Sequence, residues 1–119
     1  MAAYDLTANG RIFVFTSVGN VTTGFINVAI YDDSSTIIGA KKVVTWTIPT
    51  DPTDAFTMSI ATIADSGIFD VPAGTIVSSM ALWTTVETTY PMMTNNFEQQ
   101  YTYTNAGTFT ITDITITVV

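Results

Sequence analysis

The sequence contains no cysteine and no histidine. Without cysteine there is no disulfide framework, no thiolate metal site and no thiol nucleophile. Without histidine, Ser-His-Asp and Cys-His catalysis and imidazole metal sites are also excluded. Composition alone therefore removes most of the familiar catalytic and metal-binding arrangements.

Charged residues are scarce, at 11% of the chain, less than half of the roughly 25% found in an ordinary soluble domain. Ten carboxylates stand against the three cations Arg11, Lys41 and Lys42, so the net charge is −7. Because no basic patch can neutralise phosphates, we expect no nucleic-acid partner. A surface of uncharged polar groups packs without desolvating ions, which suits a chain inside an assembly. A monomer that relies on hydroxyl groups for solubility is the alternative.

Long apolar runs are absent too. No stretch approaches the ~20 residues of a membrane span, and residues 1–7 lack the basic and apolar regions of a signal peptide. We therefore expect no membrane partner and a cytoplasmic location.

Leucine occurs only twice, whereas threonine, isoleucine and valine occur 24, 13 and 11 times. These β-branched side chains are stiff at χ1 and fit a pleated surface, which favours an all-β fold. A chain of 119 residues fits one domain, 1–119, and can remove roughly two-thirds of its unfolded surface from water.

Residues 108–119 alternate apolar side chains with threonine, which predicts a β-strand. The apolar positions change parity within it, from odd to even: Phe109, Ile111, Ile114, Ile116 and Val118. Either a bulge at Thr112 and Asp113 restores one buried face, or the strand leaves one sheet and enters another. We favour the bulge.

Other segments also carry strand patterns, bounded by turn residues: 11–18, 21–31, 36–48, 55–63, 68–71, 75–87 and 97–104. Segment 55–63 also fits a helical stripe, but polar residues on its alternate face favour a strand. Gly39 is expected to divide 36–48 into two pieces. Lys41 and Lys42 indicate an edge strand, because lysines guard edges. Two prolines make 49–54 the clearest loop.

Short alternating strands with frequent turns predict two antiparallel sheets packed as a β-sandwich. We prefer a jelly roll to an immunoglobulin-like strand order, from the number of strands and the long 49–54 connection. A short turn at Asn105, Ala106 and Gly107 predicts that 97–104 and the C-terminal strand form a hairpin. Phe109 and Ile111 should then share the core with the aromatic face of 97–104.

We expect no catalysis, no cofactor and no resident metal. Glycoside hydrolysis by two carboxylates is the enzyme class that composition still allows, and Glu87 and Glu98 border the same connection. A calcium site is a second alternative, since loops and turns supply several aspartates: Asp32, Asp33, Asp51, Asp54 and Asp65. None completes a calcium-loop motif, and turn chemistry explains each of them.

A carbohydrate-binding β-sandwich module is the alternative function. It would use exposed rings as stacking platforms, and the candidates are Trp46, Trp83, Tyr90, Tyr101 and Tyr103. Trp46 shares its parity with apolar residues, which favours the core. Tyr101 and Tyr103 on one face are the better candidates, although aromatic packing between strands uses the same pattern.

The leading hypothesis is a non-catalytic structural or interaction protein of a larger assembly. A small, threonine-rich, cysteine-free β domain of this kind resembles the accessory virion proteins of bacteriophages, namely head decoration or cement proteins and fibre or tail components. The resemblance is one of composition over the whole chain. It implies a homo-oligomer bound to a capsid or tail protein, and location in the virion.

The residues expected to make interactions come from the last two strands. Tyr101 and Tyr103 are candidates because two rings share one face. The even-numbered residues after the parity break are candidates if the end of the chain is itself an assembly surface: Ile114, Ile116 and Val118.

Overall fold

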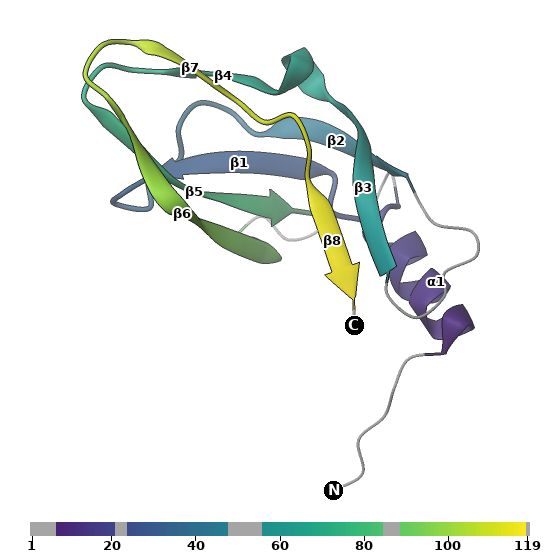
Figure 1. Cartoon of the computed structure of the whole chain (residues 1–119). Helices are drawn as coiled ribbons and strands as arrows, with labels where there is room; N and C mark the ends of the chain where they lie inside the picture. The colour runs from purple at the N-terminus through teal and green to yellow at the C-terminus, as the bar shows by residue number, and fades with distance from the viewer. Residues whose placement is uncertain (1–6, 21–23, 48–55, 85–88, 119) are drawn as a thin grey trace, which may run out of the picture.

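The computed structural model describes residues 7–20, 24–47, 56–84 and 89–118 (Figure 1). These ranges contain one helix, α1 (Ala8–Val18), and a short 3₁₀ segment, η1 (Ala64–Gly67). The strands are β1 (Asn27–Asp32), β2 (Lys42–Thr47), β3 (Phe56–Ile63), β4 (Ile68–Val71), β5 (Thr75–Trp83), β6 (Met93–Tyr103), β7 (Gly107–Thr110) and β8 (Thr115–Val118). The fold is therefore mostly β, as the β-branched composition predicts.

The strands form a curled six-stranded sheet in the order β6-β5-β1-β2-β3-β8 and a two-stranded sheet of β4 and β7. Each neighbouring pair is antiparallel. The predicted strand at 55–63 is confirmed as β3, and the alternative helix there is wrong. The predicted loop 49–54 lies outside the described residues.

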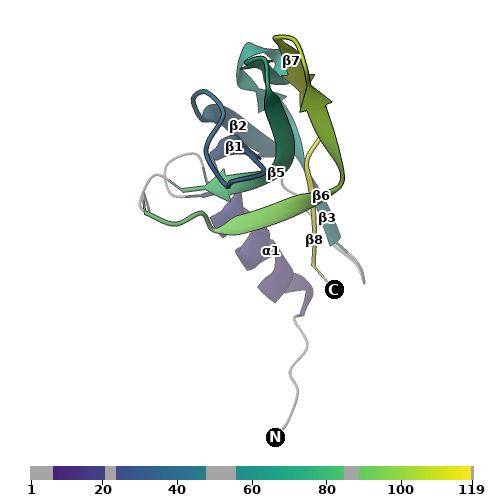
Figure 2. The same cartoon turned by 90° about the vertical axis from the view of Figure 1, so that its left-hand side faces the viewer.

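One long two-stranded ribbon runs through both sheets. Residues 56–83 pair in sequence with residues 118–93, first as β3 with β8, then as β4 with β7, and last as β5 with β6. The hydrogen bond from Gly74 N to Tyr103 O carries the pairing across the bend between the last two segments. Figures 1 and 2 show this ribbon folding over, so that its two ends form opposite edges of the large sheet. The β1–β2 hairpin fills the space between them.

The parity break before β8 coincides with an irregularity on the facing chain. Ile60 N bonds to Ile114 O and Ile111 N bonds to Gly67 O, so η1 adds four residues to one side of the ribbon. The chain passes from the β4–β7 sheet into the six-stranded sheet here, and the preferred bulge is wrong. Ile111, Ile114 and Ile116 nevertheless share one core, which the bulge was expected to ensure.

The predicted hairpin between 97–104 and the C-terminal strand is also wrong. β6 pairs with β5, and β7 pairs with β4, because both strands follow the long ribbon rather than turn back on each other. The expected aromatic contact is present: the ring of Phe109 lies 5.5 Å from that of Phe97 and 5.4 Å from that of Tyr101.

Segment 11–18, predicted as a strand, belongs to helix α1. Thr7 caps the helix, since Gly10 N donates to its hydroxyl at 3.1 Å. Phe15 is fully buried and Val18 packs against the core, whereas Phe13 is 72% exposed. In a helix, the residues that face the core fall on both odd and even positions, which explains why segment 11–18 shows no alternation.

Gly39 divides the predicted segment 36–48, with φ of 72° and β2 beginning at Lys42. The expectation that Lys41 and Lys42 guard an edge is wrong, because β2 lies between β1 and β3. Lys42 instead forms an ion pair of 2.8 Å with Asp65 in η1.

The core lies inside the curl of the large sheet. Its largest fully buried side chains are Phe15, Ile30 and Met58, which come from α1, β1 and β3. Burial of such apolar surface is the main favourable term in folding. No helix in the described ranges is both long enough and apolar enough to cross a bilayer.

The ribbon's close approach at η1 predicts different effects for two glycine substitutions. Gly39 and Gly67 both have φ of 72°, so alanine at either should cost about 1–2 kcal/mol for the left-handed conformation. At Gly67 a Cβ would also collide with the carbonyl oxygen of Ile111, whereas open space surrounds Gly39. Urea unfolding should therefore show that Gly67→Ala costs about 1–3 kcal/mol more than Gly39→Ala. Equal losses would contradict the close approach.

Candidate functional site

Strands β6 and β8 form the two edges of the six-stranded sheet. β6 pairs with β5 on one side, and β8 pairs with β3. Neither has a strand partner on its other side among the described residues, so each presents a row of backbone donors and acceptors. Because the sheet curls, the two edges border the same opening.

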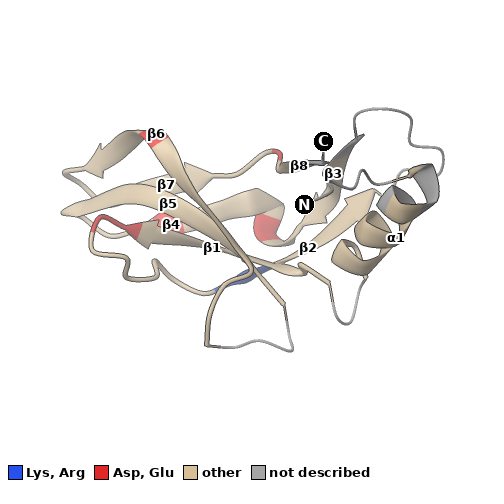
Figure 3. Cartoon of the chain, turned by 90° about the horizontal axis from the view of Figure 1, so that it is seen from below, with Lys and Arg blue, Asp and Glu red and all other residues tan. Residues whose placement is uncertain are grey.

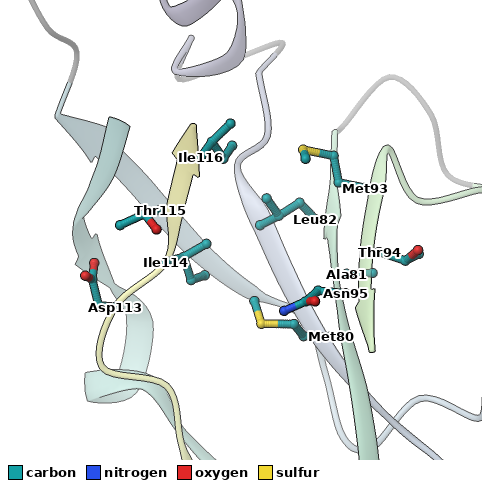
Figure 4. A pocket seen from close by; sticks show the side chains of 10 residues that line it. All are labelled: Met80, Ala81, Leu82, Met93, Thr94, Asn95, Asp113, Ile114, Thr115 and Ile116. Atoms are coloured by element: carbon teal, nitrogen blue, oxygen red, sulfur yellow. The ribbon is translucent and has the colours of Figure 1, made fainter. Parts of the chain in front are cut away.

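This opening is a cavity of about 480 Å³, which we name the edge groove. Figure 4 shows the side chains that line it: Met80, Ala81, Leu82, Met93, Thr94, Asn95, Asp113, Ile114, Thr115 and Ile116. They come from β5, β6, β8 and the two residues before β8. Its volume falls within the ~300–1,000 Å³ of ligand-binding clefts.

Along the β8 wall the side chains alternate in direction. Ile114 and Ile116 point into the groove towards Leu82, whereas Asp113 and Thr115 point away from it (Figure 4). Ile114 and Ile116 are 8% and 9% exposed, so the groove opens directly onto the core. Strand geometry imposes this arrangement, because successive side chains lie on opposite faces.

The β6 wall shows the same alternation. Met93 and Asn95 point into the groove and Thr94 points away (Figure 4). This agrees with the register, in which Met93 lies opposite Leu82 and Asn95 opposite Met80. Met93 is 43% exposed, so an apolar side chain stands at the mouth of the groove.

The lining of the groove carries one ionisable group, Asp113, and no cation. Both lysines are engaged elsewhere: Lys42 pairs with Asp65, and the Lys41 ammonium lies 3.6 Å from the centroid of the Trp83 ring. Figure 3 shows how few charged residues the described part of the chain carries, with the basic ones at the start of β2. The groove therefore lies in an uncharged to acidic environment.

The five predicted interaction residues fall in three places. Ile114 and Ile116 line the edge groove. Tyr101 and Tyr103 lie near the bend of the ribbon, where Tyr101 packs edge-to-face on Phe109 and the Tyr103 hydroxyl donates to Thr108 O at 2.7 Å. Val118 pairs through its backbone with Phe56 in β3.

Sequence analysis missed the β5 and β6 side chains that complete the groove, above all Leu82 and Met93. Segment 88–96 reads as a connection because Tyr90-Pro91 and Asn95-Asn96 are turn-forming pairs. In the structure β6 already begins at Met93. Met93 is apolar, but the next three residues are all polar, so no alternation in the sequence marks the start of β6.

The candidate carboxylates within the described ranges lie in turns and at exposed strand positions. Asp32 accepts backbone hydrogen bonds from Ser34 and Thr36 at 2.8 and 2.9 Å, as a turn aspartate does. Glu98 is exposed on β6, and its proposed companion Glu87 lies outside the described residues, as do Asp51 and Asp54. The described part of the chain contains no group of three or more Asp and Glu side chains placed to hold a metal ion.

Three of the five candidate sugar-stacking rings donate a hydrogen bond within the protein through their polar atom. Trp46 and Trp83 are buried, and their indole nitrogens donate to Phe25 O and to the Tyr31 hydroxyl, both at 2.7 Å. Tyr103 donates to the backbone as described above. Tyr90 and Tyr101 are exposed, at 69% and 45%.

Comparison of the chain with protein-family models, with curated proteins and with solved structures finds no match. The function therefore has to be inferred from the groove, the edges and the surface of this chain.

Tyr31 lies on the outer face of the sheet against Trp83. Burial raises the pKa of Tyr31 above its ordinary value of about 10, and the hydrogen bond with Trp83 acts in the opposite direction. The folded state therefore holds the phenol proton more tightly than the unfolded state. Stability from this group is present below pH ~10 and is lost as the pH rises further.

Tyr31→Phe should reduce this alkaline loss of stability while lowering stability at neutral pH. The variant has no phenol to titrate, but it leaves the Trp83 N–H without its acceptor, at a cost of about 1–3 kcal/mol. Urea unfolding of both proteins at about pH 7 and about pH 11 measures the two effects. An identical pH dependence in the variant would contradict a raised pKa at Tyr31.

Proposed function

We propose that this chain is a non-catalytic structural protein that works inside a larger assembly, bound to copies of itself and to a partner protein. The observation that carries the proposal is the edge groove, where two unpaired strand edges meet over an opening into the core. A protein that acts alone covers or guards such edges. An assembly supplies the missing cover from another chain.

The groove-facing parts of both edges lack the usual guards. Residues 93–96 of β6 and residues 114–116 of the other edge contain no lysine, no proline and no other charged residue, and Asp113 is the one charged residue in the groove lining. The pairing of β6 does shift beyond this point, since Val77 pairs with Tyr101 and Ser79 with Asn96. That irregularity twists the middle of β6 and leaves the part beside the groove regular.

A second surface favours self-association. The outward side of the β2–β3–β8 part of the sheet presents hydroxyl and apolar side chains without a charge, at Val43, Thr45, Thr47, Ser59, Thr62 and Thr115. Val43 is 54% exposed, and Thr45 and Thr62 are joined through their hydroxyl groups at 2.6 Å. Such a face packs against a copy of itself without desolvating ions.

The class of assembly that fits best is the virion of a bacteriophage, with this chain as a head decoration, cement, fibre or tail component. Threonine-rich composition and low charge support this class, as do the two unpaired strand edges at the groove. The fold proposed with it is a β-sandwich of the jelly-roll kind. The long two-stranded ribbon that folds over on itself supports that topology, because a jelly roll is also a wrapped antiparallel ribbon.

Mass measurements in solution test the proposed self-association. Light scattering over a wide concentration range should give a defined oligomer for the wild type. Val43→Glu should shift it to the monomer, because the substitution places a charge on the uncharged face. Ile68→Glu is the matched control, since Ile68 is 44% exposed in β4, which belongs to the two-stranded sheet. A wild type that stays monomeric at every concentration and binds no purified phage particle would overturn the proposed function.

A carbohydrate-binding module is the second candidate, favoured by a cavity of about 440 Å³ on the outer face. Its lining mixes aromatic, hydroxyl and amide groups: Tyr31, Ser35, Ser79, Trp83, Thr89, Pro91, Thr94 and Asn96. Lys41 covers one face of Trp83, which leaves less ring for a sugar to stack on.

Titration with a glycan panel decides between the two functions. On the assembly proposal, no glycan should change the indole fluorescence of Trp83 or raise the melting temperature. Saturable binding of one glycan that Ser79→Ala or Asn96→Ala weakens at least tenfold would establish the module instead.

A further inference from the structure

We propose that the edge groove accepts a short, extended, basic segment of a different protein, which adds as a strand between β6 and β8. This inference rests on the proposed role in an assembly and names the chemistry of the partner at that site. It follows from the walls of the groove, from its floor and from the charge of the chain.

The two strand edges beside the groove favour an occupant with an extended backbone. β6 and β8 each have a free edge, since neither has a second strand partner in the described chain, and residues of both strands line the groove. A small apolar ligand would cover the floor and leave both rows of backbone groups unpaired. A strand between the two edges pairs with both, as in strand addition to other sheets. The segment is short, because only residues 113–116 of the β8 wall line the groove.

The buried side chains that face into the groove favour an occupant with an apolar side chain at every second position. Ile114, Ile116 and Leu82 are almost fully buried and face the groove, so inward side chains of the added strand would contact them. The next side chains along that strand would lie outward beside Asp113 and Thr115. The occupant therefore alternates apolar residues with polar ones over about four or five positions, at ~3.3 Å per residue.

The charge selects a basic partner rather than a second copy. A second copy would bring a further net charge of −7 to a chain of the same charge. Both lysines are already engaged, with Asp65 and with Trp83, so neither lysine of a copy is free to pair with Asp113. Lys or Arg on the outward side of a foreign strand would meet that carboxylate, and opposite charges on adjacent strands stabilise the pair.

A synthetic heptapeptide tests the inference. The probe is Lys-Ile-Thr-Ile-Thr-Ile-Lys with a fluorescent label, in which isoleucine faces one side and lysine and threonine the other. Fluorescence anisotropy should show saturable binding to the full chain. A peptide of equal composition without the alternation, Lys-Thr-Ile-Ile-Ile-Thr-Lys, should bind at least tenfold more weakly. Equal binding of both would contradict strand addition.

Two neighbouring methionines supply a matched pair of variants. Met92 and Met93 are 42% and 43% exposed, but only Met93 lines the groove. Met93→Lys should weaken binding of the alternating peptide at least tenfold, whereas Met92→Lys should change it less than twofold. Both substitutions lie on exposed side chains, and thermal unfolding checks that both variants remain folded. Equal effects would place the peptide outside the groove.

A second pair of variants tests the charge. Asp113→Asn should weaken binding of the lysine peptide about two- to fivefold at low salt, the range of an exposed cross-strand ion pair. Asp33→Asn makes the same charge change at an exposed turn outside the groove and should leave binding unchanged. The peptide Glu-Ile-Thr-Ile-Thr-Ile-Glu should bind more weakly than the lysine peptide, and equal or tighter binding would contradict a basic partner.

The outcomes separate this inference from the proposed function. If the wild type forms oligomers but binds no peptide, the assembly role stands and the strand-accepting groove is wrong. If Met93→Lys abolishes the oligomer and the oligomer excludes the peptide, the groove holds a second copy, which overturns the foreign partner. If a strictly monomeric chain binds the alternating peptide through Met93, the groove stands and self-association is wrong.

Discussion

Backbone pairing between residues 56–83 and residues 93–118 is the constraint on which the rest of the structure depends. Both segments of this ribbon pass from the six-stranded sheet into the two-stranded sheet and back, so the ribbon joins the two sheets. The bend near Gly74 and the insertion at η1 decide where the ribbon turns. Its two ends then define both edges of the large sheet, and the edge groove is the space that remains between them.

The sequence predicts the elements of this fold better than their pairing. Alternation identifies β1, β3 and β5, because one face of each is buried against the core. It fails at α1, where Phe13 and Phe15 are residue types that strands prefer, although Thr7 before the helix and Gly19 after it are the ends that a helix uses. Alternation alone also suggests a bulge at residues 112–113. The extra residues are in fact Ala64–Gly67, on the segment that faces this part of the chain, so the local pattern cannot reveal them. Pairing partners of this kind are distant in sequence and leave no local signal.

The sequence likewise predicts some residues of the candidate site and not others. The parity of Ile114 and Ile116 places them together on one face, and the structure places both in the groove. Two adjacent lysines are typical of an edge strand, yet Lys42 lies in β2 inside the sheet and pairs with Asp65. The edge strands β6 and β8 contain no lysine. Which strand lies at an edge depends on the whole topology, so neither Met93 nor the groove can be derived from local pattern.

The ribbon also has a consequence for how the chain folds. Its pairing is closest in sequence at one end, where Leu82 and Met93 are eleven residues apart, and most distant at the other, where Phe56 and Val118 are 62 residues apart. Closing a short loop costs less entropy than closing a long one, so pairing that starts beside the β5–β6 connection can extend step by step towards β8. In this order β8 is the last strand to pair, and the edge of β3 that it covers stays open until then.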